Sequence, residues 1–155
     1  MELKKLLSKQ KELDNLIFKN AEISEYPKEK IKLALLVELG ELANEVQSFK
    51  YWKKEQYIVR SKIEEEWADC FHFALSLENE LHQANEAVIN HIDLILDKED
   101  IDKAFLVAFS NVSDEQCVLA TIVALGRCLD ISLEEMEAAY NKKYKKNIER
   151  QQQGY

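Results

Sequence analysis

Two pairs of acidic residues are spaced so that each pair would lie on one face of a helix. Glu38 and Glu41 form the first pair, and Glu66 and Asp69 form the second. Because residues three positions apart are neighbours on a helix surface, the carboxylates of each pair would repel one another. The repulsion costs about 0.2–0.5 kcal/mol per pair at an exposed surface and more where water is scarce. The spacing therefore predicts that a positive ion binds between the two pairs.

Both acidic pairs border a predicted apolar core. At about 100° per residue, Glu38 and Glu41 lie beside an apolar stripe of their own helix, and the second pair has the same layout. Four carboxylates in such a position suit Mg²⁺, which prefers hard oxygen ligands and often binds together with phosphates. The alternative interpretation is a solvated acidic surface, which is common in a chain with 29 acidic residues.

A di-iron site is another metal site that carboxylates in a helical bundle can form. It requires two Glu-x-x-His motifs and two further glutamates on separate helices. The sequence offers only Asp69-x-x-His72, since neither His82 nor His91 has a glutamate three residues before it. The pattern therefore favours magnesium over iron.

The composition predicts an all-α fold. The 155 residues include three glycines and one proline, too few for the turns of a many-stranded sheet, and 46% are apolar, enough for one continuous core. We therefore expect a single domain over residues 1–155, built as a bundle of about five to six helices.

Apolar periodicity and capping motifs predict where these helices begin and end. Pro27 suits the first turn of a helix, where its missing N–H has no partner to lose. The segment from Glu86 to Asn111 carries no recognisable motif. The pattern of a capping box, which opens a helix, occurs at Ser61-x-x-Glu64, Ser113-x-x-Gln116 and Ser132-x-x-Glu135. The expected helices span about 3–19, 27–49, 61–81, 86–96, 113–129 and 132–150.

Charge and apolar patterning narrow the class of partner. A net charge of −8 argues against general nucleic-acid binding, which needs a basic stripe. No apolar run approaches the ~20 residues of a membrane span, and the amino terminus lacks the pattern of a signal peptide. Cys70, Cys117 and Cys128 lack the C-x-x-C spacing of a zinc or redox site. They fit core positions in a reducing compartment, so we expect a cytoplasmic protein.

Several segments together resemble one family. Beyond the acidic pairs, the resemblance extends to both ends of the chain, through Gln10-x-x-Leu13-Asp14 and a tail similar to Lys-Asn-x-x-Asn-x-x-Arg-Gln-x-x-Gly-Tyr. The chain resembles the dimeric all-α dUTPases, part of a wider group of all-α NTP pyrophosphatases that includes the MazG-like enzymes. The paired acids identify only the wider group, and the tail and residues 49–53 narrow it to dUTPases. The segments that carry the resemblance are E-L-G-E-L-A-N-E (38–45), F-K-Y-W-K (49–53), E-E-W-A-D-C-F-H-F (65–73) and the tail from residue 143.

The resemblance implies a function for the acidic pairs. Glu38, Glu41, Glu66 and Asp69 would bind two or more Mg²⁺ ions that grip a triphosphate. A water would then attack the β-phosphorus of dUTP in line, giving dUMP and pyrophosphate and allowing dUDP as a second substrate. Glu38 or Glu41 would act as the general base. The family is homodimeric, and a two-fold assembly would cover the apolar face of residues 115–129.

The resemblance also implies the nucleoside contacts. Trp52 and Phe73 would enclose the nucleoside, with Phe73 against the deoxyribose, while Gln10 and Asp14 would face uracil. For each aromatic residue, packing in the core is the alternative. Gln10 and Asp14 could instead be exposed residues that interrupt an apolar helix face.

The basic tail is the third part of the implied site. Lys143, Asn147 and Arg150 would contact phosphate, with Lys53 as a further candidate. Cations in the last turns of a helix also oppose the helix dipole without any ligand, which is the alternative. The chain departs from the family pattern at Tyr144, where the family usually has Asn, so any contact by that amide is absent.

Two other functions fit the sequence. One is pyrophosphate release from another nucleotide, such as dCTP, with the same metal ligands and a different base pocket. The other is a helical interaction module without activity, in which the acidic pairs would bind no metal.

Overall fold

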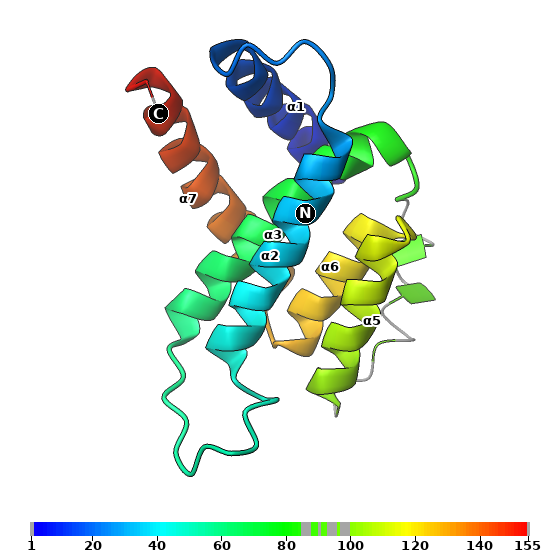
Figure 1. Ribbon diagram of the computed structural model, residues 1–155, viewed down its shortest axis with the longest axis vertical. Coiled ribbons are helices and arrows are strands. Elements are labelled where there is room, and N and C mark those ends of the chain that lie inside the picture. Colours follow the sequence, from blue (N-terminus) through cyan, green and yellow to red (C-terminus); the bar gives the residue numbers. More distant parts are fainter. Residues whose placement is uncertain (1, 85–87, 90, 93–95, 97–99, 155) are drawn as a thin grey trace.

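The computed structural model describes residues 2–84, 88–89, 91–92, 96 and 100–154. In this part of the chain, six helices form an all-α bundle, which confirms the predicted fold class (Figure 1). The helices are α1 (Leu3–Asn20), α2 (Lys28–Val46), α3 (Arg60–Leu81), α5 (Ile101–Ser113), α6 (Val118–Cys128) and α7 (Leu133–Gln152). None of the helices described is long and apolar enough to span a membrane.

Helix α3 is the central element of the bundle. It contacts α1, α2, α6 and α7, and its pairing with α2 is the most extensive helix contact. From Trp67 to Glu78 its side chains are nearly all buried. A helix that is buried on all sides must be packed by neighbours on all sides, so residues on α3 can meet residues from several helices.

Helix α6 is also buried on almost every side, which corrects one expectation. Its residues from Val118 to Gly126 are all buried, and α6 packs against α3 and α5. The apolar face expected within residues 115–129 is therefore covered by the same chain. It needs no second copy to bury it.

Of the three capping motifs, one predicted a helix start correctly and two did not. At Ser132 the capping box is present: the Ser132 side chain accepts from Glu135 N, and the Glu135 side chain accepts from Ser132 N. At Ser61 the expectation was wrong, because α3 begins at Arg60 and its N-cap is Val59, which has no capping side chain. Ser61 is exposed in the first turn.

The expected start at Ser113 was also wrong. Ser113 is the last residue of α5, and Gln116 N donates back to Asn111 O, which closes the end of that helix. Helix α6 begins only at Val118, after Cys117, whose φ is 48°. The serine thus ends a helical segment that the sequence did not reveal, and the residues after it form a turn.

Helix α5 was not foreseen, and the end of α2 also differs from the expected position. Asp100 caps α5 by accepting from Lys103 N. Helix α2 ends at Val46 rather than near residue 49, because Gln47 adopts a left-handed conformation with φ 62°. The helix expected over 86–96 lies largely outside the described residues, although 88–89 and 91–92 are helical.

Candidate active site

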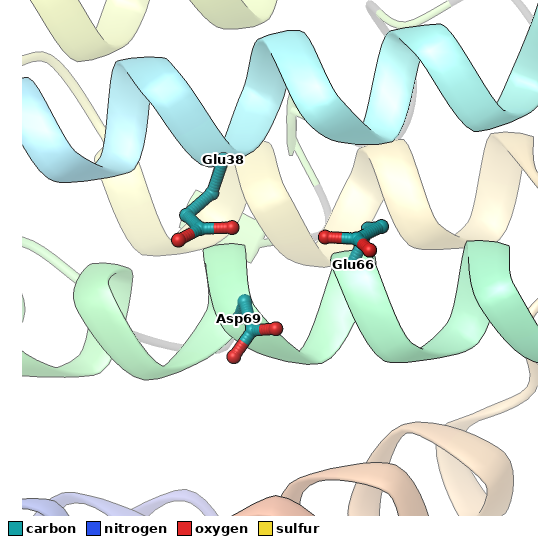
Figure 2. A group of neighbouring side chains, drawn as sticks. All are labelled: Glu38, Glu66 and Asp69. Atoms are coloured by element: carbon teal, nitrogen blue, oxygen red, sulfur yellow. The ribbon is translucent and has the colours of Figure 1, made fainter.

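Three carboxylates converge where α2 packs against α3. Glu38 extends from α2 toward Glu66 and Asp69 of α3 (Figure 2). One carboxylate oxygen of each residue lies within 4.8 Å of the other two. The acidic cluster, defined as these three residues, joins one residue of the first predicted pair to both residues of the second. The i, i+3 spacing of Glu66 and Asp69 points both side chains to the same partner helix.

The surroundings of the acidic cluster disfavour its negative charge. Burial, together with the charges of Asp69, Glu41 and Glu66, raises the pKa of Glu38 to about 7. Burial and neighbouring carboxylates also raise the pKa of Glu66. Burial raises the pKa of Asp69, although a hydrogen bond from Lys143 opposes this. A divalent cation would relieve these costs, and three hard oxygen donors are suitable ligands for one. The acidic cluster can therefore hold a divalent metal.

Glu41 lies at the edge of the acidic cluster. Its side chain is exposed, and its oxygens are not among those within 4.8 Å of one another. Its charge nevertheless contributes to the raised pKa of Glu38 and of Glu66, so it is near both. The structure thus brings three of the four predicted metal ligands together and leaves the fourth beside them.

A cavity of about 470 Å³ adjoins the acidic cluster. Residues of α1, α2, α3 and α7 line it, so it brings together segments from both ends of the chain. Most of the residues implicated by the sequence lie on its wall. They are Gln10, Asp14, Glu38, Asp69, Phe73, Lys143, Asn147 and Arg150.

A buried polar network forms part of the cavity wall. Gln10 Nε2 donates to Asp14 Oδ1 over 2.8 Å, and Gln10 Oε1 lies 2.7 Å from His72 Nδ1. Gln10 and Asp14 are 3% and 9% exposed, so they are not surface residues. Burial lowers the pKa of His72 to about 4, which keeps the imidazole neutral near pH 7. This part of the cavity wall can exchange hydrogen bonds with an uncharged polar ligand.

Comparison with known families identifies the protein class. A family model described as dUTPase matches residues 2–155. The chain belongs to the all-α dUTPase family. The family carries dUTP diphosphatase activity, so the enzyme hydrolyses dUTP and its substrate is a deoxyuridine nucleotide. A search of curated proteins found no match.

The sequence reasoning missed two residues that line this dUTPase cavity, His72 and Ser76, and also Tyr26, which contacts Ser76. His72 was considered only as part of an incomplete iron motif, yet it contacts Gln10. Tyr26 and Ser76 lie 3.0 Å apart through their hydroxyl oxygens, and Ser76 lines the cavity. The signal was present: Asp69, Phe73 and Ser76 follow one another at i, i+4 and i+7 on α3, as residues on one helix face do.

Two residues that the dUTPase resemblance placed at the nucleoside and phosphates lie elsewhere. Trp52 is 60% exposed in the loop between α2 and α3, where its ring meets those of Phe49 and Tyr51. Lys53 donates to Gln47 Oε1 over 3.0 Å in the same loop. The loop extends away from the ends of α2 and α3 (Figure 1). Neither residue lines the cavity of its own chain.

Tyr144, the departure from the dUTPase pattern, has a packing role. Its ring lies 6.0 Å from that of Tyr140 and 5.5 Å from the ammonium group of Lys9. It is partly buried against the core. The side chain that replaces the usual amide therefore contributes to the contact between α7 and α1.

Proposed function

We propose that this enzyme hydrolyses dUTP with Mg²⁺ held by Glu38, Glu66 and Asp69. The observation that supports the proposal is that Glu38 and Asp69 of the acidic cluster line the same cavity as the buried polar residues Gln10 and Asp14. Such a cavity has room for a nucleotide with its phosphates toward the acids and its base toward Gln10. We further propose that residues 1–155 act as a single domain, since the family match extends over residues 2–155.

The acidic cluster fits Mg²⁺ by its chemistry. Its donors are carboxylate oxygens, and their raised pKa values reflect burial and mutual repulsion in the absence of a cation. When bound, Mg²⁺ neutralises phosphate charge and polarises the phosphorus–oxygen bonds of the substrate.

The basic face of α7 would bind the phosphates. Lys143, Asn147 and Arg150 follow one another at i, i+4 and i+7, so they share a helix face, and all three line the cavity. The guanidinium of Arg150 can grip two phosphate oxygens at once. These three residues of α7 approach the cavity from the side opposite α2. The phosphates would therefore lie between them and Glu38.

The buried network would bind uracil. Along its pairing edge, uracil presents an acceptor, a donor and an acceptor, and a carboxamide such as Gln10 offers both kinds of partner. The hydrogen bonds from Gln10 to Asp14 and between Gln10 and His72 hold that amide in place. Phe73 lines the same cavity one helix turn after Asp69, a position suited to packing against the deoxyribose.

Glu41 is the proposed general base. It borders the acidic cluster while its oxygens remain outside it, so it can take a proton without giving up a metal ligand. The attacking water would lose its proton to a Glu41 carboxylate oxygen as it adds to phosphorus in line with the leaving oxygen. Attack at the β-phosphorus would give dUMP and pyrophosphate from dUTP, and dUMP and phosphate from dUDP.

The test is phosphate and pyrophosphate release from dUTP, dUDP, dCTP, dTTP and UTP, each with Mg²⁺ and with a chelator. We expect dUTP to be preferred and chelation to abolish turnover. Equal turnover of all five nucleotides would contradict the uracil contacts, and full activity in chelator would contradict the metal. Glu38→Gln should lose activity, whereas Glu29→Gln, an exposed change on the same helix, should not.

We also infer that the enzyme is a homodimer, joined through α2 and α5. Leu33 and Val37 on α2 and Leu106 on α5 are 62%, 52% and 70% exposed. Beside them lies a groove of about 560 Å³ whose lining is mostly apolar, including Phe49, Phe105, Leu106 and Phe109. Large exposed apolar side chains grouped in this way are typical of a protein contact surface.

The three free cysteines support a reducing compartment, such as the cytoplasm.

A further inference from the structure

Lys143 contacts the acidic cluster directly. Its ammonium group donates to Asp69 Oδ2 and lies 3.5 Å from Glu65 Oε1. The Lys143 side chain is only 13% exposed, and that of Asp69 is 17% exposed. Because water screens such a contact poorly, Lys143 neutralises part of the charge of the acidic cluster.

Lys143 also belongs to the nucleotide cavity. It lines that cavity with Asn147 and Arg150, and it lines a second groove, of about 440 Å³, between α3 and α7. A lysine has a flexible four-carbon chain and three rotatable donors, so its ammonium group can change partner without movement of the helix. Glu65, which also pairs with Lys146 over 3.3 Å, would keep a cation when Lys143 leaves.

A metal ion and Lys143 cannot both bind Asp69 without cost. Both are cations, and both seek the oxygens of the same carboxylate. At separations of a few ångströms in a partly buried site, repulsion between them would be large. Phosphate oxygens beside the metal offer Lys143 an alternative partner that, like Asp69, is negatively charged.

We propose that Lys143 is the counter-ion of the metal site in the nucleotide-free enzyme and moves to the phosphates when metal and nucleotide bind. This inference rests on the proposed metal site. Its consequence is that the free enzyme binds metal weakly, while nucleotide, by drawing Lys143 away, strengthens metal binding. By reciprocity, metal then strengthens nucleotide binding.

Binding of Mn²⁺, measured by electron paramagnetic resonance of the free ion, tests the proposal without turnover. Without nucleotide, Lys143→Gln should bind Mn²⁺ about tenfold more tightly than the wild type, because a competing cation is gone. Lys143→Arg keeps the charge and should bind like the wild type. Lys145→Gln removes the same charge from an exposed position on the same helix and should leave affinity unchanged.

A second measurement uses an α,β-imido analogue of dUTP, which resists hydrolysis. The wild type should bind Mn²⁺ much more tightly with the analogue than without it, and this gain should shrink in Lys143→Gln. Equal or weaker Mn²⁺ binding by nucleotide-free Lys143→Gln would overturn the role of Lys143, as would wild-type affinity that the analogue leaves unchanged. Asp69→Asn separates the two proposals: if it leaves Mn²⁺ binding intact, the metal site itself is wrong.

Discussion

Among the carboxyl groups of the described residues, that of Glu38 has the most strongly raised pKa. It lies half-buried beside Glu66 and Asp69, and its pKa of about 7 is well above the ordinary 4.5. The folded enzyme therefore holds a proton on Glu38 that the unfolded chain has already released. Without a cation, this proton contributes to stability, which makes stability depend on both pH and metal.

Metal-free enzyme should lose thermal stability as the pH rises from about 5 to about 8. A raised pKa in the folded state stabilises the protein fully below the unfolded value of 4.5, and this contribution is lost as the pH passes about 7. Glu38→Gln should flatten the dependence, since the amide does not ionise. Unfolding followed by circular dichroism in chelator measures this, with Glu29→Gln as the control that keeps the wild-type slope. Parallel curves for wild type and Glu38→Gln would contradict the assignment.

Replacing Glu41 should separate the general base from the metal ligands. Glu41→Gln should lower the single-turnover rate of dUTP hydrolysis by about 10²–10⁴-fold, the usual contribution of a general base, while Mn²⁺ binding remains. Asp69→Asn should instead weaken Mn²⁺ binding, because Asp69 lies in the acidic cluster and Glu41 lies outside it. Loss of Mn²⁺ binding in Glu41→Gln would make Glu41 a ligand rather than the base.

At the scale of helices, the site depends on how tightly α6 packs against α3. A side chain at Gly126 of α6 would place its Cβ 2.6 Å from Trp67 Nε1 and 2.5 Å from Met136 Cε. Trp67 is fully buried, and its indole donates to Ile122 O. It is also the neighbour of Glu66 in sequence, so the packing of α6 against α3 helps fix the position of the acidic cluster.

Gly126→Ala should therefore destabilise the enzyme by about 1–3 kcal/mol, the usual cost of an added group in a packed core. Urea unfolding at equilibrium measures this loss. Gly40→Ala is the matched change in α2, where a Cβ would meet nothing within 4 Å. It should stabilise the protein by up to about 1 kcal/mol, because alanine favours the helix more than glycine does. Similar effects of the two changes would show that close packing at Gly126 is not the cause.

Sequence spacing predicted the parts of the fold that depend on local periodicity. It gave the pairing of the α2 and α3 acids and the start of α7 at Ser132. It missed α5, where the cap is Asp100, and it misplaced the start of α6, because a capping pattern at Ser113 also fits the turn that ends a helix. The capping pattern therefore fits either the start of a helix or the turn that ends one. Which of the two forms depends on how the helices on each side pack.

The same limit applies to the candidate site. Eight of the implicated residues line one cavity, because helix faces are fixed by spacing once the bundle forms. Trp52 and Lys53 lie in an extended loop, whose course depends on contacts such as that of Lys53 with Gln47. His72 was passed over because its role comes from a contact with Gln10, 62 positions away, which no local pattern encodes.

At the scale of the whole molecule, the outer face of α2 and α5 carries the exposed apolar side chains to which we assign the dimer contact. Leu33, Val37 and Leu106 are exposed beside the groove that Phe49 and Phe109 help to line. None of the residues that line the groove lines the cavity, so a partner seated in the groove would leave the cavity wall intact. A net charge of −8 on each copy opposes association, so apolar contact must supply its free energy.

Leu106→Glu should convert the proposed dimer to a monomer. The change places a carboxylate at the exposed apolar position on α5, and burying it in a dimer would cost several kcal/mol without a partner charge. Sedimentation velocity over a range of protein concentrations measures the result, with circular dichroism to confirm that the helices remain. Ala21→Glu adds the same charge at an exposed position after α1 and should leave the dimer intact. A Leu106→Glu protein that still sediments as a dimer would place the interface elsewhere. A wild type that is monomeric at high concentration would contradict the dimer itself, since no other cluster of exposed apolar side chains on the described surface combines two helices in this way.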